Sequence, residues 1–170
     1  MPKLIVLDLD YTLIYSTKEK LREPDFNVED YNVYIRPGLD NFLNFCSIKG
    51  KVGIWSQGDK CYVEEVVSKL IGDSKELLFK WSKEECVSYA RMFGFENSES
   101  HYANLKVVKD LNLVSERFGF DISDIIVVDD NPELHYIDLE NVITATPWEG
   151  DEKDSFLYSV IDKLSRIKDI

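Results

Sequence analysis

Short apolar runs recur along the chain at intervals that fit the strands of a parallel sheet. The runs are rich in β-branched residues and lack the polar alternation of a half-exposed strand. Uninterrupted runs of this kind are typical of strands that are covered on both faces, as those of a parallel sheet are. The predicted strands span residues 3–7, 51–55, 125–128 and 141–145.

Apolar residues at helical spacing lie between and after these runs. The segment 37–49 begins with a proline, which suits a first helical turn, and repeats apolar residues on one side. Ser82 and Glu85, three residues later, have the form of a capping box, which favours a helix start. The predicted helices span residues 37–49, 59–70, 83–93, 107–118 and 154–167.

Strands that alternate with helices predict an α/β fold. We expect a three-layer α/β/α sandwich with a central parallel sheet and right-handed crossovers. The chain has 170 residues, the size of one domain, and contains no internal repeat. The sequence therefore predicts a single domain over residues 1–170, with the polar stretch 95–103 as its most mobile loop.

Charge and composition narrow the possible partners. The chain carries 32 acidic and 20 basic residues, a net charge of −12. Nucleic-acid binding relies on a basic face that neutralises phosphates, so a nucleic-acid partner is disfavoured. No apolar stretch approaches the roughly 20 residues that cross a bilayer, so no membrane partner is expected. The apolar N-terminal run is interpreted as a buried strand rather than a signal peptide.

The cysteines indicate a reducing compartment. Cys46, Cys61 and Cys86 are odd in number and have no CxxC spacing, which argues against a disulfide framework and against a zinc site. We interpret them as small buried hydrophobes. An intracellular location, cytoplasmic or nuclear, is therefore predicted.

Residues able to do chemistry follow three of the predicted strands. Asp8 and Asp10 follow the first, Ser56 the second, and Asp129 and Asp130 close the third. Because ligands bind beyond the carboxyl ends of parallel strands, these groups should converge at one edge. Four carboxylates would repel one another without a cation, and hard oxygen ligands favour Mg²⁺. A single Asp here is usually a turn former, but three such strand ends together favour a site.

The order of these residues resembles the four motifs of the haloacid dehalogenase superfamily. Asp8-Leu9-Asp10-Tyr11-Thr12-Leu13 resembles its first motif, DxDxT after an apolar strand. Ser56 resembles the second motif, Lys109 the third, and Asp129-Asp130-Asn131-Pro132 the acidic fourth. The resemblance spans roughly residues 3–148 and implies a Rossmann-like phosphatase fold.

One branch of that superfamily fits best. The segment 34–39 (YIRPGL) resembles the segment that leads into the first helix of the FCP/SCP-type phosphatases, which act on the C-terminal domain of RNA polymerase II, and of their NLI-interacting-factor-like relatives. Tyr11 departs from the branch, which commonly has an acidic residue there, and this leaves the substrate preference open. The stretch WSKEEC is similar to a phosphate-contacting segment of the branch, which would place Lys83 near the substrate; a surface lysine is the alternative.

The resemblance implies a role for each acidic residue. Asp8 would be the nucleophile that forms an aspartyl-phosphate, and Asp10 would protonate the leaving oxygen and later deprotonate the attacking water. The side chains of Asp8, Asp129 and Asp130 and the backbone carbonyl of Asp10 would surround Mg²⁺. Lys109 would neutralise charge on Asp8 and on the transferred group.

The resemblance also implies a phosphate-binding set. Ser56 with the amides of Gln57 and Gly58 would hydrogen-bond the phosphoryl oxygens, together with Lys109, and Thr12 would hold the turn that places Asp10. The implied phosphate-binding residues are Thr12, Ser56, Gln57, Gly58 and Lys109.

The interpretation of five residues depends on their local context. Lys109 is preferred to Lys106 as the catalytic lysine because it begins the KDL pattern of the branch. His101 and His135 are interpreted as surface loop residues, since they are too far apart for a metal signature. Trp148 either lines the site or packs in the core.

The segments between the motifs are too short for a cap domain. Residues 14–30 suffice for a flap, and the insertion near residues 73–104 is small. An uncovered site can admit a phosphorylated side chain, so we expect a phosphoprotein or phosphopeptide substrate. A lidless enzyme could instead close its site by association, so a monomer or a small homo-oligomer is expected.

Other functions fit part of the pattern. A phosphatase of small metabolites or of nucleic-acid ends would share the motifs, although the latter needs a basic groove. A catalytically silent phosphopeptide-binding module would keep the fold, but the retained Asp8, Asp10 and Lys109 speak against it. A phosphorylated receiver domain lacks a DxDxT first strand.

Overall fold

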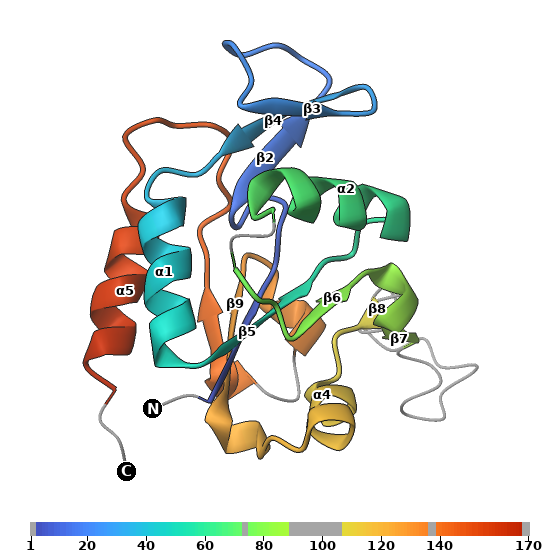
Figure 1. Ribbon diagram of the computed structural model, residues 1–170, viewed down its shortest axis with the longest axis vertical. Coiled ribbons are helices and arrows are strands. Elements are labelled where there is room, and N and C mark those ends of the chain that lie inside the picture. Colours follow the sequence, from blue (N-terminus) through green and yellow to red (C-terminus); the bar gives the residue numbers. More distant parts are fainter. Residues whose placement is uncertain (1–2, 73–74, 89–106, 136–138, 168–170) are drawn as a thin grey trace.

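Five parallel strands form the centre of the molecule, in the order β10-β9-β1-β5-β6 (Figure 1). The computed structural model describes residues 3–72, 75–88, 107–135 and 139–167. Every neighbouring pair in this sheet runs parallel. The strands are β1 (Leu4–Leu7), β5 (Lys51–Trp55), β6 (Phe79–Trp81), β9 (Ile125–Asp129) and β10 (Val142–Thr144).

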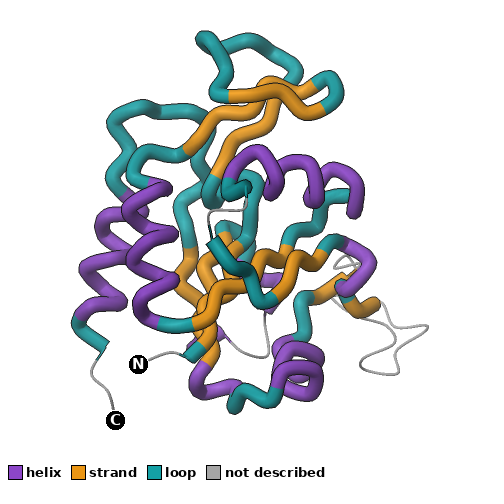
Figure 2. Tube along the Cα trace, in the orientation of Figure 1, coloured by secondary structure: helices purple, strands orange, loops and turns teal. Residues whose placement is uncertain are grey.

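Helices cover both faces of this sheet (Figure 2). Side chains that alternate along β1 explain why: Ile5 and Leu7 pack with buried residues of α1, α2 and α5, whereas Leu4 and Val6 pack with α4. The predicted three-layer α/β/α fold is therefore confirmed. The helices are α1 (Leu39–Lys49), α2 (Lys60–Leu70), α4 (Leu111–Phe118) and α5 (Phe156–Ser165).

A small antiparallel sheet stands above the carboxyl end of β1 (top of Figure 1). It consists of β2 (Ile14–Thr17), β4 (Tyr31–Ile35) and β3 (Phe26–Val28), in that order. The chain enters it directly from the first motif. This sheet is a flap, as predicted for the segment after the first motif, and the described residues contain no large cap domain.

The predicted helix over residues 83–93 is wrong where the structure describes it. The capping box of Ser82 and Glu85 is formed, but it caps a single 3-10 turn, η1 (Lys83–Glu85). The chain then becomes β7 (Val87–Ser88), because this segment pairs with β8 (Val107–Val108). Backbone pairing with a partner distant in sequence thus replaces the helix that the local signal favours. Residues 89–93 of the prediction, and the loop predicted over 95–103, lie outside the described residues.

One helix starts later than predicted, and one strand of the central sheet was not predicted. The helix expected over residues 107–118 starts only at Leu111, since Val107 and Val108 belong to β8 and the Asp110 carboxylate caps the helix by accepting from the backbone N–H of Asn112. Strand β6 was not predicted because three residues are too short to show a pattern. The remaining 3-10 turns are η3 (Ile122–Asp124), η4 (Pro132–His135) and η5 (Leu139–Asn141).

Within the described ranges, every helix is too short or too polar to cross a bilayer.

Candidate active site

The candidate site lies where the order of the sheet changes direction. From β1 at the centre, the chain builds β5 and β6 on one side and then β9 and β10 on the other. Ligands of open α/β sheets bind beyond the carboxyl ends of the strands at such a point. Asp8 is the first residue after β1, and its backbone N–H donates to the carbonyl of Val128 at 3.0 Å, which holds it beside β9.

Lys109 joins two of the predicted acidic residues. Its Nζ donates to Asp8 Oδ1 at 2.8 Å and to Asp129 Oδ2 at 2.6 Å. All three side chains are buried, and the backbone N–H of Lys109 donates to the carbonyl of Leu134 at 2.9 Å. Lys109 lies in the short link between β8 and α4, and its side chain reaches the acidic residues from there. The alternative lysine, Lys106, lies outside the described residues.

Three carboxylates form an acidic cluster suited to a divalent cation. Asp8, Asp129 and Asp130 each offer an oxygen atom, and these atoms lie within 4.8 Å of one another. The ammonium of Lys109 balances only one of the three negative charges that they carry when ionised. A hard cation such as Mg²⁺, which binds one or two carboxylates and keeps several waters, fits both the oxygen donors and the remaining charge.

The electrostatics of the cluster depend on burial and on Lys109. Burial raises the pKa of Asp8 to about 8, although Lys109 opposes this. Burial would also raise the pKa of Asp129, but Lys109 and His135 outweigh it and lower that pKa to about 2. Burial and the neighbouring Asp129 raise the pKa of Asp130. Burial lowers the pKa of Lys109, but the two carboxylates outweigh it, so Lys109 stays charged.

Asp129 and Asp130 differ in how freely they can bind a cation. Asp129 Oδ2 is shared by Lys109 and by His135 Nε2 at 2.9 Å, while its Oδ1 accepts from the backbone N–H of Asn131 at 2.8 Å. The carboxylate of Asp130 accepts from Thr12 Oγ1 at 3.2 Å, and Asp130 is partly exposed. Asp130 is thus the freer ligand, and Asp129 is the counter-ion of Lys109.

Asp10 does not place its carboxylate in the cluster. The sequence predicts four converging carboxylates, and the structure brings together three. The alternation of a strand does not extend to Asp10, because β1 ends at Leu7 and the chain turns through Tyr11, whose φ is 60°. The Asp10 carboxylate instead accepts from the hydroxyl of Tyr62 at 2.7 Å. Burial raises its pKa, and the hydrogen bond from Tyr62 lowers it in part.

The turn after Asp10 is held from three sides. The carbonyl of Tyr11 accepts from the backbone N–H of Trp148 at 2.8 Å, and the carbonyl of Thr12 accepts from Arg36 Nη1 at 3.0 Å. The hydroxyl of Thr12 accepts from the backbone N–H of Asp130 at 3.0 Å. Thr12 therefore ties the first motif to the fourth.

Ser56 begins a loop whose amides lie at the same edge. Its backbone N–H donates to the carbonyl of Trp81, and its Oγ accepts from the backbone N–H of Gly58, both at 3.0 Å. A Cβ on Gly58 would lie 2.7 Å from the ring of Tyr62, so a larger residue would not fit without a shift. Gln57 is exposed beside them. The role of this loop in binding phosphate stays a prediction.

Lys83 lies on the surface. Its ammonium pairs with Asp59, and its side chain is 55% exposed. The alternative that made it a surface lysine fits this geometry better than a role against phosphate.

The predicted placement of His135 is wrong, and that of Trp148 was left open between the site and the core. His135 is predicted in a surface loop, yet it is 1% exposed, because the turn η4 directs its side chain inward to contact Asp129. Its only sequence signal is a histidine six residues after the first aspartate of the fourth motif. Trp148 is buried, and its indole N–H donates to the carbonyl of Asp151, so its side chain packs in the core. His101 lies outside the described residues.

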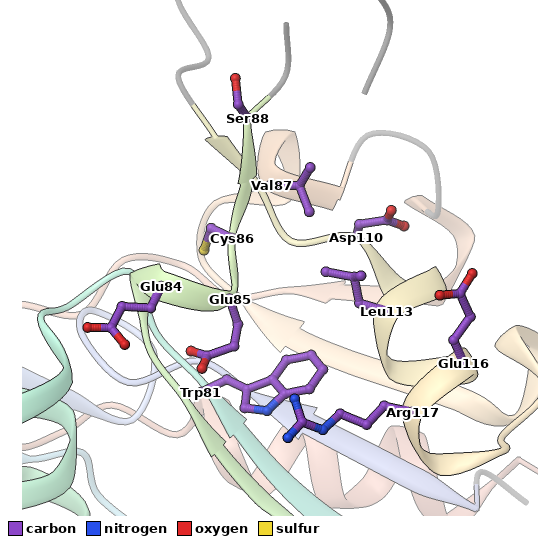
Figure 3. Close-up of a pocket in the computed structure, with 10 residues that line it drawn as sticks. All are labelled: Trp81, Glu84, Glu85, Cys86, Val87, Ser88, Asp110, Leu113, Glu116 and Arg117. Atoms are coloured by element: carbon purple, nitrogen blue, oxygen red, sulfur yellow. The ribbon is translucent and has the colours of Figure 1, made fainter. Parts of the chain in front are cut away.

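A separate cavity of about 840 Å³ opens between η1, β7 and α4 (Figure 3). It shares no residue with the acidic cluster. Its wall includes the carboxylates of Glu84, Glu85 and Glu116, and Arg117 lies over the ring of Trp81. These carboxylates would repel a phosphate group, so the cavity is disfavoured as a phosphate site. The candidate active site therefore remains the acidic cluster at the carboxyl edge of the sheet.

Comparisons with known proteins agree with this geometry. A family model described as NLI interacting factor-like phosphatase matches residues 3–170. A probable C-terminal domain small phosphatase from Dictyostelium discoideum is 27% identical over 179 residues, which cover 99% of this chain and 52% of that protein. The putative CTD phosphatase-like protein 355R of Invertebrate iridescent virus 3 is 31% identical over 173 residues, which cover 90% of this chain and 88% of that protein.

The fold also matches a solved structure. Fcp1, described as an essential RNA polymerase II CTD phosphatase, superposes with a TM-score of 0.58 at 20% identity, covering 95% of this chain and 49% of that one. At this identity the likeness extends to the fold alone. The chain spans about half the length of Fcp1 and of the Dictyostelium relative.

Proposed function

The chain belongs to the NLI interacting factor-like phosphatase family of the haloacid dehalogenase superfamily, and on this basis we propose that it is a Mg²⁺-dependent phosphatase of phosphoproteins or phosphopeptides. The observation that carries the proposal is the contact of Lys109 with both Asp8 and Asp129 at the carboxyl edge of the sheet. A buried carboxylate beside a fixed ammonium is a suitable phosphoryl acceptor, because the ammonium offsets the charge of the incoming phosphate.

In the first step, a carboxylate oxygen of Asp8 attacks the phosphorus atom of the ester. The bond between this oxygen and phosphorus forms, and the bond from phosphorus to the ester oxygen breaks. The electron pair of the broken bond stays on the leaving oxygen, which takes a proton from Asp10. The raised pKa of Asp10 suits this role, because it keeps a larger share of the carboxyl protonated near neutral pH.

In the second step, Asp10 accepts a proton from water. The oxygen of that water attacks phosphorus, and the bond from phosphorus to Asp8 breaks. Inorganic phosphate leaves, and both carboxyl groups return to their starting states. One side chain thus serves first as acid and then as base, which fits its position outside the acidic cluster.

The other residues hold charge and position. Asp8 and Asp130, with the carbonyl of Asp10 and with Asp129 beside them, would hold Mg²⁺, which supplies Lewis-acid stabilisation of phosphate charge. Lys109, the Ser56 hydroxyl and the amides of Gln57 and Gly58 would bind phosphoryl oxygens, and Thr12 would keep the turn in place. The metal identity and these roles are supported by the oxygen donors and by the placement of the side chains.

The proposed substrate class rests on access and on relatives. The described residues carry a flap and no large cap, so a side chain of another protein can reach Asp8. The relatives named above are described as CTD phosphatases or phosphatase-like proteins. The net charge of −12 disfavours nucleic-acid ends as substrates. We also propose that residues 1–170 form one domain with small insertions near 14–30 and 73–104. The intracellular location and the oligomeric state stay predictions.

The test combines turnover with trapping of the intermediate. The protein should hydrolyse para-nitrophenyl phosphate only with Mg²⁺, and acid quenching with a labelled phosphopeptide should leave label on Asp8. Asp8→Asn should fold, as judged by thermal unfolding, and show neither turnover nor label. Absence of turnover in the wild type, with peptide binding retained, would instead support a silent binding module.

A panel of substrates then separates the remaining alternatives. Phosphopeptides should give higher kcat/KM values than sugar phosphates, nucleotides or phosphorylated oligonucleotide ends. A clear preference for a small metabolite would overturn the phosphoprotein assignment while leaving the chemistry intact.

A further inference from the structure

Three side chains from three elements form a hydrogen-bonded chain that ends on Asp10. The hydroxyl of Tyr62, in the first turns of α2, lies 2.7 Å from Asp10 Oδ1. The hydroxyl of Ser16, in β2, lies 2.6 Å from the hydroxyl of Tyr62. Helix α2 lies directly below the flap (Figure 1), so this chain joins the helix, the flap and the first motif.

The chain has a direction. A phenol carries one proton, and Tyr62 donates that proton to Asp10. The geometry of the short contact between Ser16 and Tyr62 allows either oxygen to donate; when the proton of Tyr62 is directed to Asp10, the proton of this contact comes from Ser16. The order is therefore Ser16 to Tyr62 to Asp10, with Oδ1 of Asp10 as the final acceptor.

This direction distinguishes the two oxygen atoms of Asp10. In this arrangement the hydroxyl of Tyr62 occupies Oδ1, which leaves Oδ2 as the oxygen atom able to exchange a proton with the substrate. We infer that Tyr62, oriented by Ser16, is a positioning residue that directs the proton of Asp10 to Oδ2, from which it passes to the leaving oxygen of the substrate. The inference rests on the proposed function, since it concerns the acid of the same reaction.

The ring of Tyr62 is fixed independently of its hydroxyl. It packs edge-on against Tyr31, with ring centroids 6.3 Å apart, and it closes the space above Gly58. Tyr62→Phe keeps these ring contacts and removes only the donor to Asp10. Ser16→Ala removes the group that orients the hydroxyl and leaves the phenol in place.

A general acid contributes most when the leaving group is poor, so the test compares two esters. We propose to measure kcat/KM, which reports the step that releases the alcohol, for phenyl phosphate and for para-nitrophenyl phosphate, whose leaving group needs less help. Tyr62→Phe should lower kcat/KM about 10-fold for phenyl phosphate and less than about 3-fold for the nitrophenyl ester. Ser16→Ala should change the same ratio in the same direction, by a smaller factor.

Two controls make the result decisive. Tyr158→Phe, the same change at an exposed position of α5, should leave both values unchanged. In an Asp10→Asn background, adding Tyr62→Phe should change nothing further, since the acid that it positions is gone. Equal losses for both esters, or additive losses in the double variant, would overturn the inference. A wild type inactive on both esters would overturn the proposed function as well.

Discussion

His135 Nε2 lies 2.9 Å from Asp129 Oδ2, the same oxygen atom that Lys109 Nζ contacts at 2.6 Å. Both the imidazole and the carboxylate are almost fully buried, at 1% exposure. The histidine and the lysine therefore hold Asp129 from two directions. In the part of the chain that the structure describes, the other nitrogen of the ring, Nδ1, has no hydrogen-bond partner, so the contact with Asp129 is the one polar function that the imidazole performs there.

We predict that His135→Ala destabilises the protein and slows turnover. The change removes a buried donor to Asp129 and leaves a cavity, so the free energy of unfolding should fall by roughly 1–3 kcal/mol. Lys109 would then be held less firmly against Asp8, and kcat should fall about 10-fold. Chemical denaturation and turnover of para-nitrophenyl phosphate measure the two effects.

The matched control for this histidine is Glu133→Ala. Glu133 is exposed in the same 3-10 turn, so its loss should change stability by no more than about 0.5 kcal/mol. Equal effects of the two substitutions would show that the buried contact with Asp129 is unimportant.

The acidic cluster predicts that stability depends on pH when no metal is bound. The pKa of Asp8 is raised from 3.8 to about 8 by burial, so the folded state holds this proton more tightly than the unfolded state. The stability that this provides is fully present below about pH 4 and is lost as the pH rises to about 8. Asp129 has the opposite shift, and its contribution is lost only as the pH falls through about 2. In EDTA, the melting temperature should therefore decrease between about pH 5 and pH 8.

Mg²⁺ and Asp8→Asn should each remove this dependence. A bound cation favours the ionised carboxylates and stabilises the folded state by mass action. The asparagine side chain cannot titrate. Melting temperatures measured across the pH range, with EDTA and with Mg²⁺, test both statements. A flat profile in EDTA would count against the buried, proton-holding Asp8.

Asp129 and Asp130 should respond differently to substitution. Asp130→Ala removes the freer ligand of the cluster, so the Mg²⁺ concentration that gives half-maximal activity should rise at least about 10-fold. Asp129→Asn keeps the shape but removes the charge that faces Lys109, so kcat should fall while the Mg²⁺ requirement changes less. Activity measured against Mg²⁺ concentration for both variants tests the contrast. Identical Mg²⁺ shifts would mean that both residues bind the metal equally.

The sequence was most informative where strand chemistry and motif order coincide. The runs at residues 3–7, 51–55 and 125–128 each appear as parallel strands, because uninterrupted apolar runs fit a sheet covered on both faces. Asp8, Lys109 and Asp129 meet as expected, since the carboxyl ends of β1 and β9 are neighbours. The roles of these residues in catalysis stay predictions.

The sequence was least informative where contacts are distant or turns are irregular. The helix expected after Ser82 is wrong because β7 pairs with β8 across a long gap in sequence, which no local signal contains. The direction of the Asp10 carboxylate depends on a positive φ at Tyr11, and a tyrosine in the sequence does not predict that conformation. The burial of His135 could not be predicted from the sequence, because its contact with Asp129 depends on the turn η4.

Arg36 offers a last prediction, on what holds the first motif in place. Its guanidinium is fully buried and donates to both carboxylate oxygens of Asp154 at 2.8 and 2.9 Å, to the carbonyl of Thr12 at 3.0 Å and to that of Thr146 at 3.1 Å. Arg36→Lys keeps the charge but cannot make this planar set of bonds. The free energy of unfolding should fall by about 3 kcal/mol, and kcat should fall with it because the turn that carries Asp10 is released.

Arg166→Lys is the matched control, since its ion pair with Asp162 is exposed and should contribute less than about 0.5 kcal/mol. Denaturation curves of the two variants decide the matter: if Arg36→Lys is no less stable than Arg166→Lys, the buried guanidinium does not hold the first motif.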